Sequence, residues 1–286
     1  MTVNATNIAE VEMASYDFSK YIRGRYIPHI WCPGCGNGIV LKSLIRAIAS
    51  SGLDLEKVCL VSGIGCSSRT TGYMDFNTLH TTHGRALAFA TGLKFARPEL
   101  PVLVVSGDGD ALAIGGNHFI HSCRRNIDLT LVLFNNHIYG MTGGQFSPTT
   151  PRKSFASTSP FGNIEPAFDI CQLAIGAGAT YVARGTTYHA LALDKLILGG
   201  IHNKGFSIIE VVTQCPVYYG RKNNQKSPAA ALMWQRDHAV AVDRFRKMTP
   251  EEQEGKFAIG VLHNQPRPEY NEEYQKLVDR VSGRAS

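Results

Sequence analysis

The sequence has little charge, no long hydrophobic segment and no cluster of basic residues. Asp, Glu, Lys and Arg make up 18% of the 286 residues, against about 25% in an ordinary globular domain. Asp, Lys, Arg or His interrupts every apolar stretch before it reaches the ~18 residues that span a bilayer. Glu10 and Glu12 stand where a signal peptide would carry basic and then apolar residues. We therefore expect a cytoplasmic protein with no membrane contact.

The net charge of +6 comes from 29 basic and 23 acidic residues that are scattered along the chain. Nucleic-acid binding requires a clustered basic stripe, so we expect no nucleic-acid partner. The net positive charge favours binding of anionic small ligands or of an acidic protein partner. The low charge and the 28 glycines favour an enzyme subunit with a large buried contact.

Predicted helices and strands alternate from Asn37 onward. Strands are expected at 57–63, 100–107, 129–136, 179–183 and 206–212. Helices are expected at 37–52, 84–97, 114–125, 165–177 and 187–203. Continuous apolar strands separated by helices are typical of a parallel sheet covered on both faces. The predicted fold class is therefore α/β, with a parallel sheet and helices on both faces.

Changes in composition divide the chain into three parts. Residues 1–28 show no clean period and are expected to form an irregular N-terminal arm, and residues 29–228 form the main domain. Residues 229–286, with a helix expected near 229–247, are interpreted as a C-terminal extension that covers a partner or a sheet edge.

Two polar motifs follow predicted strands. Gly107-Asp108-Gly109-Asp110 ends the strand at 100–107, and Asn135-Asn136 ends the strand at 129–136. Ligands of open parallel sheets bind at the carboxyl ends of strands, and carboxylate, amide and carbonyl oxygens suit Mg²⁺. GDG alone is more often a turn. Because Asn136 follows Asp108 by 28 residues, the two motifs together favour a site for Mg²⁺ and a diphosphate.

This pair of motifs resembles the fingerprint of the thiamin-diphosphate enzymes, in which GDG is followed about this far downstream by NN. The resemblance implies the thiamin-diphosphate-binding fold. It also implies that Asp108 and Asn136 are side-chain ligands of Mg²⁺ and that Ile138 is a backbone-carbonyl ligand. Four residues would line the diphosphate: Gly109, Asp110, Gly140 and Met141.

The seven cysteines are an odd number, and disulfides rarely persist in a reducing compartment. Cys32 and Cys35 form a C-x-x-C pair in an irregular segment, which disfavours a redox dithiol. Cys66 and Cys215 each follow a predicted strand at the expected cofactor edge. The other three are expected to be packing residues: Cys59, Cys123 and Cys171. Four thiolates fit zinc or a four-iron cluster, and ligand chemistry alone does not separate these two.

Six sequence blocks, in order between residues 20 and 225, extend the resemblance. They are CPGCG, IGCSSR, HTTHGRALAFATGLKFARP, GDGDALAIGGNHFIH, NNHIYGMTGGQFSPTTP and TQCP. They look like the beta subunit of the 2-oxoacid:ferredoxin oxidoreductases, and most like its 2-oxoglutarate branch. The resemblance implies one four-iron four-sulfur cluster beside the thiamin, held by Cys32, Cys35, Cys66 and Cys215. It also implies cofactor contacts from Ile64, Gly65, Cys66 and Ser67.

The resemblance assigns two further residues. His83 would contact the cofactor, although a histidine in this place also suits the first turn of a helix. Arg69 would pair with the 1-carboxylate of the substrate, for which a bidentate guanidinium is suited, unless it is an ordinary surface arginine. Gly143 stands where some relatives carry a lysine implicated in coenzyme A binding, so that contact is expected elsewhere or is absent.

The implied reaction is oxidative decarboxylation of 2-oxoglutarate with coenzyme A to succinyl-CoA and CO₂, with electrons passing through the cluster to ferredoxin, or its reversal. In this family the glutamate that activates thiamin belongs to a separate pyrimidine-binding domain. The resemblance therefore implies an alpha or alpha-gamma partner subunit and a dimer of heterodimers. The chain has no C-x₂-C-x₂-C-x₃-C run, so only one cluster is expected in this subunit.

Three alternatives stay open. One is the same chemistry on pyruvate or another 2-oxoacid. The second is a non-oxidative thiamin enzyme, which would have no use for four positioned cysteines. The third is a cluster-bearing electron-transfer subunit without catalysis, which would leave the two polar motifs without a role.

Overall fold

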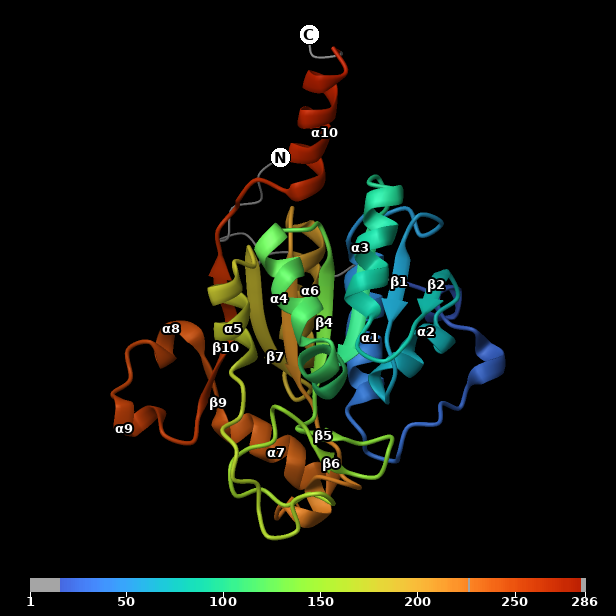
Figure 1. The fold of residues 1–286 in the computed structure, drawn as a ribbon. Coiled ribbons are helices and arrows are strands. Elements are labelled where there is room, and N and C mark those ends of the chain that lie inside the picture. Colours follow the sequence, from blue (N-terminus) through green and yellow to red (C-terminus); the bar gives the residue numbers. More distant parts are fainter. Residues whose placement is uncertain (1–15, 226, 284–286) are drawn as a thin grey trace.

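The computed structural model describes residues 16–225 and 227–283 and contains one eight-stranded sheet (Figure 1). The strand order is β2-β1-β3-β4-β8-β7-β10-β9. The six strands from β2 to β7 run parallel, which confirms the predicted α/β class. These six are β1 (Cys59–Ser62), β2 (Asn77–His80), β3 (Val102–Gly107), β4 (Thr130–Asn135), β7 (Tyr181–Thr186) and β8 (Ser207–Val212).

Helices cover both faces of the sheet, as predicted (Figure 1). On β3, Leu103 and Val105 pack into the hydrophobic cluster of α1 and α6, while Val102 and Val104 pack into that of α3, α4 and α5. Successive side chains of a strand point to opposite faces, so a strand buried on both faces is mostly apolar. The helices are α1 (Asn37–Ser50), α3 (Ala86–Ala96), α4 (Gly116–Arg125), α5 (Ile170–Ala177) and α6 (Ala190–His202).

The structure corrects two predicted helices. The helix expected from 165 begins at Ile170, because the side chain of Asp169 accepts hydrogen bonds from the backbone N–H groups of Cys171 and Gln172 and so caps α5. The helix expected at 229–247 is α7 (Pro228–His238), which ends where the chain becomes the short strand β9 (Ala239–Ala241). The short helices α8 (Val242–Phe245) and α9 (Pro250–Gln253) follow.

The C-terminal part adds strands that the sequence analysis did not predict. β10 (Phe257–Asn264) pairs antiparallel with β7 and extends the sheet, so the sheet is not parallel throughout. β9 pairs parallel with β10. The last helix, α10 (Tyr270–Val281), projects from the body of the molecule (Figure 1).

The predicted N-terminal arm is described only in part. Residues 1–15 lie outside the described residues, and the following segment contains two short 3₁₀ turns, Phe18–Tyr21 and Gly24–Tyr26. Within the described ranges, no helix is long and apolar enough to cross a membrane.

Candidate active site

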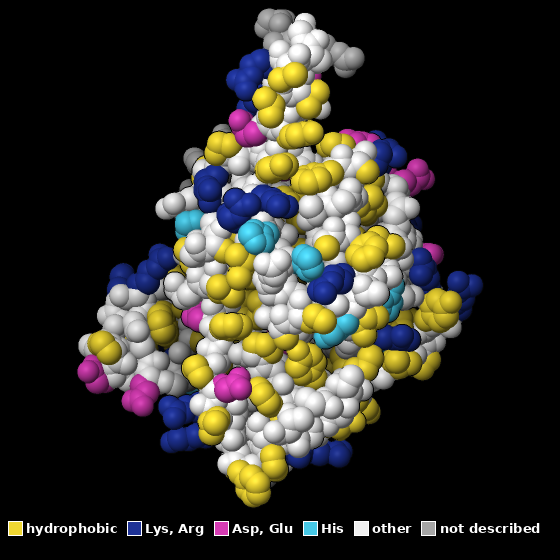
Figure 2. Space-filling model, in the orientation of Figure 1, with side chains coloured by type: hydrophobic (Ala, Val, Ile, Leu, Met, Phe, Trp, Pro, Cys, Tyr) yellow, Lys and Arg dark blue, Asp and Glu magenta, His cyan; other side chains and the backbone are white. Residues whose placement is uncertain are grey.

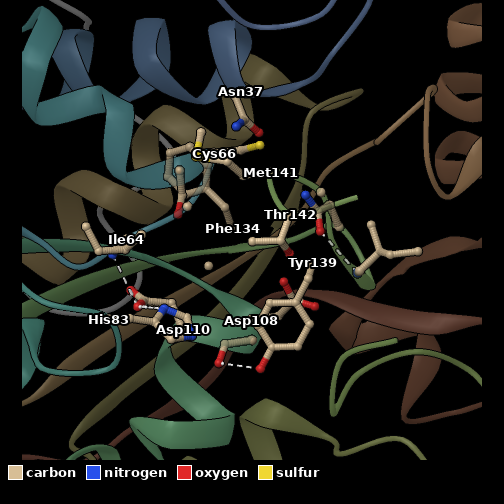
Figure 3. A pocket seen from close by; sticks show the side chains of 17 residues that line it. Asn37, Ile64, Cys66, His83, Asp108, Asp110, Phe134, Tyr139, Met141 and Thr142 are labelled. Atoms are coloured by element: carbon tan, nitrogen blue, oxygen red, sulfur yellow. Dashed lines mark hydrogen bonds and ion pairs between the residues drawn. The ribbon is translucent and has the colours of Figure 1, made fainter. Parts of the chain in front are cut away.

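A cavity opens at the carboxyl ends of β1, β3 and β4. Ligands of open parallel sheets bind at this edge. Figure 3 shows its walls, in which Asp108, Asp110 and His83 lie at one end and Asn37 and Cys66 at the other. The lining residues are Asn37, Ile64, Gly65, Cys66, Ser67, His83, Gly107, Asp108, Gly109, Asp110, Phe134, Asn136, Ile138, Tyr139, Gly140, Met141 and Thr142.

Asp108 supplies a buried carboxylate to this cavity. Its side chain follows β3 directly and is 2% exposed. The hydroxyls of Ser147 and Thr149 both donate to its Oδ2, each at 2.6 Å. Burial raises the pKa of Asp108, and these two hydrogen bonds oppose that rise. The structure thus holds an oxygen donor at the place where the sequence analysis expects a metal ligand, with Asn136 and Ile138 in the same wall.

Asp110 organises the loops around this end of the cavity. Its Oδ1 accepts hydrogen bonds from the backbone N–H of Gly84 at 2.7 Å and of Ile64 at 3.3 Å, and the hydroxyl of Ser106 donates to Oδ2 at 2.5 Å. The Nδ1 atom of His83 lies 2.7 Å from Oδ1 of Asp110 but makes no hydrogen bond of acceptable geometry. Asp110 therefore joins the loops after β1, β2 and β3, and it leaves a polar atom of His83 unsatisfied.

Gly109 lets the backbone after β3 approach the opposite wall. A Cβ atom at this position would lie 2.3 Å from Cε1 of Tyr139, so no larger residue fits unless Tyr139 moves. The hydroxyl of Tyr139 donates to the carbonyl oxygen of Gly109 at 3.1 Å. Close approach of glycine backbone is what a diphosphate cradle requires.

Three loops that carry cysteines meet beside the cavity. The indole N–H of Trp31 donates to the carbonyl oxygen of Cys66 at 2.7 Å. The side-chain amide of Gln214 donates to the carbonyl oxygen of Gly34 at 3.1 Å, and the N–H of Gly36 donates back to the carbonyl oxygen of Gln214 at 3.2 Å. These bonds fasten the C-x-x-C loop to the loops of Cys66 and Cys215.

The four predicted cluster ligands are near neighbours. Burial raises the pKa of Cys35 to about 12, and the thiols of Cys215, Cys66 and Cys32 add to the rise. Burial likewise raises the pKa of Cys66 to about 11. A Cβ atom on Gly140 would lie 3.5 Å from the sulfur of Cys66 and 3.7 Å from that of Cys215.

Among the described residues, no group of three or more His, Cys, Asp or Glu side chains is arranged to hold a metal ion. Four thiolates suit zinc or a four-iron cluster, and ligand chemistry alone does not separate these two.

A buried polar network supports the Asp108 wall from behind. Arg184 donates from Nε to Oε2 of Glu210 at 2.7 Å, and Asn135 donates from Nδ2 to Oε1 of Glu210 at 2.8 Å. The hydroxyl oxygen of Thr149 lies 2.9 Å from Oδ1 of Asn135 and 2.6 Å from Oδ2 of Asp108. The network thus runs from β7 through β8 and β4 to the cavity.

We expect Arg184→Met to destabilise the protein by about 3–5 kcal/mol, because it leaves the carboxylate of Glu210 buried without its cation. The side chains of this pair are only 11% and 4% exposed. Urea unfolding of the purified complex measures the loss. Arg97→Met is the matched control, since the ion pair of Arg97 with Glu99 is exposed and should contribute nothing measurable. Equal losses in the two variants would contradict the structural role given to Arg184.

The structure brings together most of the residues that the sequence analysis expects at the cofactor. All residues expected at thiamin, the diphosphate or Mg²⁺ line the cavity. Arg69, which is exposed, is absent from the lining. Of the remaining cysteines, Cys123 and Cys171 are buried in helices and Cys59 begins a strand, as expected. Sequence analysis missed Asn37, Phe134, Tyr139 and Thr142, although Tyr139 lies between two residues that it selected.

The fold and the cavity define a thiamin-diphosphate-binding domain. The family model for the thiamine pyrophosphate enzyme, C-terminal TPP binding domain, matches residues 63–211. The match therefore runs from the loop after β1 into β8, which includes Asp108 and Asn136.

Comparisons with individual proteins narrow this class. The chain is 50% identical over 275 residues to 2-oxoglutarate synthase subunit KorB of Methanothermobacter thermautotrophicus, covering 96% of each chain. It is 52% identical over 262 residues to the subunit of the same name from Methanocaldococcus jannaschii, covering 92% of this chain and 97% of that protein.

A solved structure agrees with these relatives. It is 2-oxoglutarate:ferredoxin oxidoreductase from Magnetococcus marinus with 2-oxoglutarate, coenzyme A and succinyl-CoA bound. The two folds match with a TM-score of 0.84 over 95% of this chain and 92% of that chain, and the sequences are 33% identical. The chain belongs to the beta-subunit family of the 2-oxoacid:ferredoxin oxidoreductases, and it is similar to the 2-oxoglutarate synthase subunits of that family.

Proposed function

We propose that this chain is the thiamin-binding beta subunit of an enzyme that oxidatively decarboxylates 2-oxoglutarate with coenzyme A, and that passes the electrons to ferredoxin. One observation carries the proposal. The oxygen donors of Asp108 and Asn136 share a cavity with Cys66, whose loop is fastened to those of the other three predicted cluster ligands. The relatives named for 2-oxoglutarate support this choice of substrate.

The residues of the cavity fit thiamin diphosphate with Mg²⁺. Asp108 supplies a buried negative oxygen, Asn136 an amide and Ile138 a carbonyl in the same wall. Gly109 leaves room for the backbone to approach a diphosphate, and Gly140 and Met141 line the same space. When bound, thiamin diphosphate supplies the electron sink for decarboxylation. The chain itself binds and orients the cofactor, and the aliphatic and aromatic walls restrict water.

The four thiols fit a four-iron four-sulfur cluster. Cys32, Cys35, Cys66 and Cys215 come from three loops that hydrogen bonds hold together, and Cys35 feels the charges of the other three thiols. Such a cluster takes four thiolate ligands. Its position beside the cavity suits one-electron transfer from the reacting centre toward ferredoxin.

An alpha subunit with a pyrimidine-binding domain would complete the site, in a dimer of heterodimers. Large apolar side chains are fully or mostly exposed on this chain, among them Phe161 at 97%, Ile164 at 81% and Val281 at 78%. Figure 2 shows hydrophobic side chains spread over this face and along α10. Exposed apolar surface of this kind marks protein interfaces, which supports a large contact with the partner.

The deciding experiment uses the complex co-purified anaerobically with its alpha subunit. We expect stoichiometric thiamin diphosphate, four irons per beta subunit from the proposed cluster, and reduction of a dye that depends on both 2-oxoglutarate and coenzyme A. A complex that contains the cluster but no thiamin would indicate an electron-transfer subunit without catalysis. Reduction that needs no coenzyme A would contradict the proposed acyl acceptor.

Substrate preference provides a further prediction. We expect kcat/KM for 2-oxoglutarate to exceed that for pyruvate by at least about tenfold, which is roughly 1.4 kcal/mol and within reach of one additional carboxylate contact. Steady-state assays with both acids measure it. Equal turnover of pyruvate would refute the branch assignment and favour a broader 2-oxoacid enzyme.

Arg69→Ala tests the binding of the carboxylate that both acids share. Arg69 lies one turn after Cys66 and is exposed in this chain, so it is available to a substrate that the partner subunit encloses. We expect the variant to lower kcat/KM for both acids by similar factors. A change in the ratio between the two acids, without a common loss, would show that Arg69 reads the distal end of the substrate instead.

A further inference from the structure

Six described residues have buried polar side-chain atoms without a hydrogen-bond partner. They are Asn37, Ser68, Thr70, His83, Thr213 and Asn271. Only Asn37 and His83 line the cavity. Asn37 differs from all the others because both atoms of its amide, Nδ2 and Oδ1, lack a partner while the residue is 1% exposed.

Asn37 occupies a defined place in the site. It is the first residue of α1 and follows the C-x-x-C loop, two residues after Cys35. Figure 3 shows its amide at the same end of the cavity as Cys66, away from Asp108 and Asp110. Native proteins rarely leave a buried donor and acceptor unpaired. The amide is therefore free to bond a molecule that fills the cavity.

The chemistry of an amide restricts what it binds. Nδ2 donates and Oδ1 accepts, and neither carries a charge. A carboxylate or an inorganic sulfide only accepts, so either would leave Oδ1 unpaired. An oxo oxygen likewise only accepts, from Nδ2, but the hydroxyl that forms from it can donate to Oδ1, so the amide can contact a reacting oxygen in both of its protonation states.

We propose that Asn37 is a substrate-binding residue whose amide contacts the oxygen on C2 of the 2-oxoacid. This inference rests on the proposed function and extends it. Arg69 is assigned to the 1-carboxylate of the substrate, and Asn37 would bind the neighbouring oxygen on C2. The residue lines the same cavity as the proposed diphosphate-binding residues, at the end where Cys66 lies.

The test uses two acids that do not react, so that binding is measured at equilibrium. 2-Hydroxyglutarate carries an oxygen on C2 and glutarate lacks it. In the thiamin-loaded complex, we expect calorimetry to show that the wild type binds 2-hydroxyglutarate about tenfold tighter than glutarate, the size of one hydrogen bond. Asn37→Leu should bring this ratio close to one without changing the affinity for glutarate. Asn37→Ala serves as a second variant if leucine disturbs α1.

The matched control is Asn271→Leu, since Asn271 also has an unpartnered Oδ1 but lies on α10 outside the cavity. It should leave the ratio unchanged. Equal binding of the two acids by the wild type, or a ratio that both Asn37 variants leave intact, overturns the proposal. A shifted midpoint potential of the cluster with an intact ratio assigns the amide to the cluster and also overturns it. A wild-type complex without thiamin refutes the proposed function instead, before any variant is made.

Discussion

Asp108→Ala is expected to abolish the binding of thiamin diphosphate to the assembled complex while leaving its iron content unchanged. Among the proposed Mg²⁺ ligands, only Asp108 carries a negative charge, and hard divalent cations depend on such oxygens. The loss of even a supporting ligand costs about 10–100-fold in metal affinity, so loss of the carboxylate itself should exceed 100-fold. Thiamin content after gel filtration and the iron–sulfur absorbance give the two readouts.

Asp108→Asn separates charge from shape. The hydroxyls of Ser147 and Thr149 donate to the carboxylate, and an amide oxygen accepts the same bonds, so the wall of the cavity stays intact. This variant should also lose thiamin diphosphate, although its unfolding midpoint remains near that of the wild type. Stoichiometric thiamin in either variant would show that Asp108 is not the metal ligand.

The central strands could be predicted from the sequence because burial on both faces restricts the residue types along the strand. β3, β4 and β8 are buried on both faces, so apolar residues predominate in each. The outer strands of the sheet show no such pattern. β2 is mostly exposed, and β10 contains a register shift between Val261 and His263. Pairing with a neighbour, rather than the local sequence, makes these segments strands.

The site was predictable where chemistry and topology coincide. Asp108 and Asn136 each follow a buried parallel strand, and carboxyl ends of parallel strands share one edge. Asn37 could not be selected in this way, because an asparagine at the start of a helix is ordinary. Its importance comes from burial without a hydrogen-bond partner, which only the packed structure reveals. The opposite holds for Arg69. A sequence motif selected it, but in this chain alone its side chain is exposed and does not line the cavity.

The two groups of cysteines differ in their surroundings in the structure. Cys123 and Cys171 lie on the inner faces of α4 and α5, where they are fully buried in the core. A thiol in such a place behaves as a small hydrophobic group. The four proposed ligands instead lie in loops, and loops from distant parts of the chain meet only after the sheet has formed.

Cys35→Ala is expected to remove the cluster, to abolish dye reduction and to lower the stability of the complex. In the chain without metal, the thiol of Cys35 is buried and its pKa is raised to about 12, so iron must provide the energy to hold it as a thiolate. At such a site the energy of metal binding is also folding energy. Iron analysis, visible absorbance and thermal unfolding of the complex, purified without oxygen, measure the three effects.

Cys123→Ala is the matched control, because it also removes a buried thiol, yet one packed against the apolar side chains of the core. It should keep four irons and nearly full activity, and cost only the small cavity that a missing sulfur leaves. Cys215→Ala should behave like Cys35→Ala, since the hydrogen bonds of Gln214 join the two loops. Loss of iron from Cys123→Ala, together with full iron in Cys215→Ala, would show that the cluster is held by a different set of cysteines.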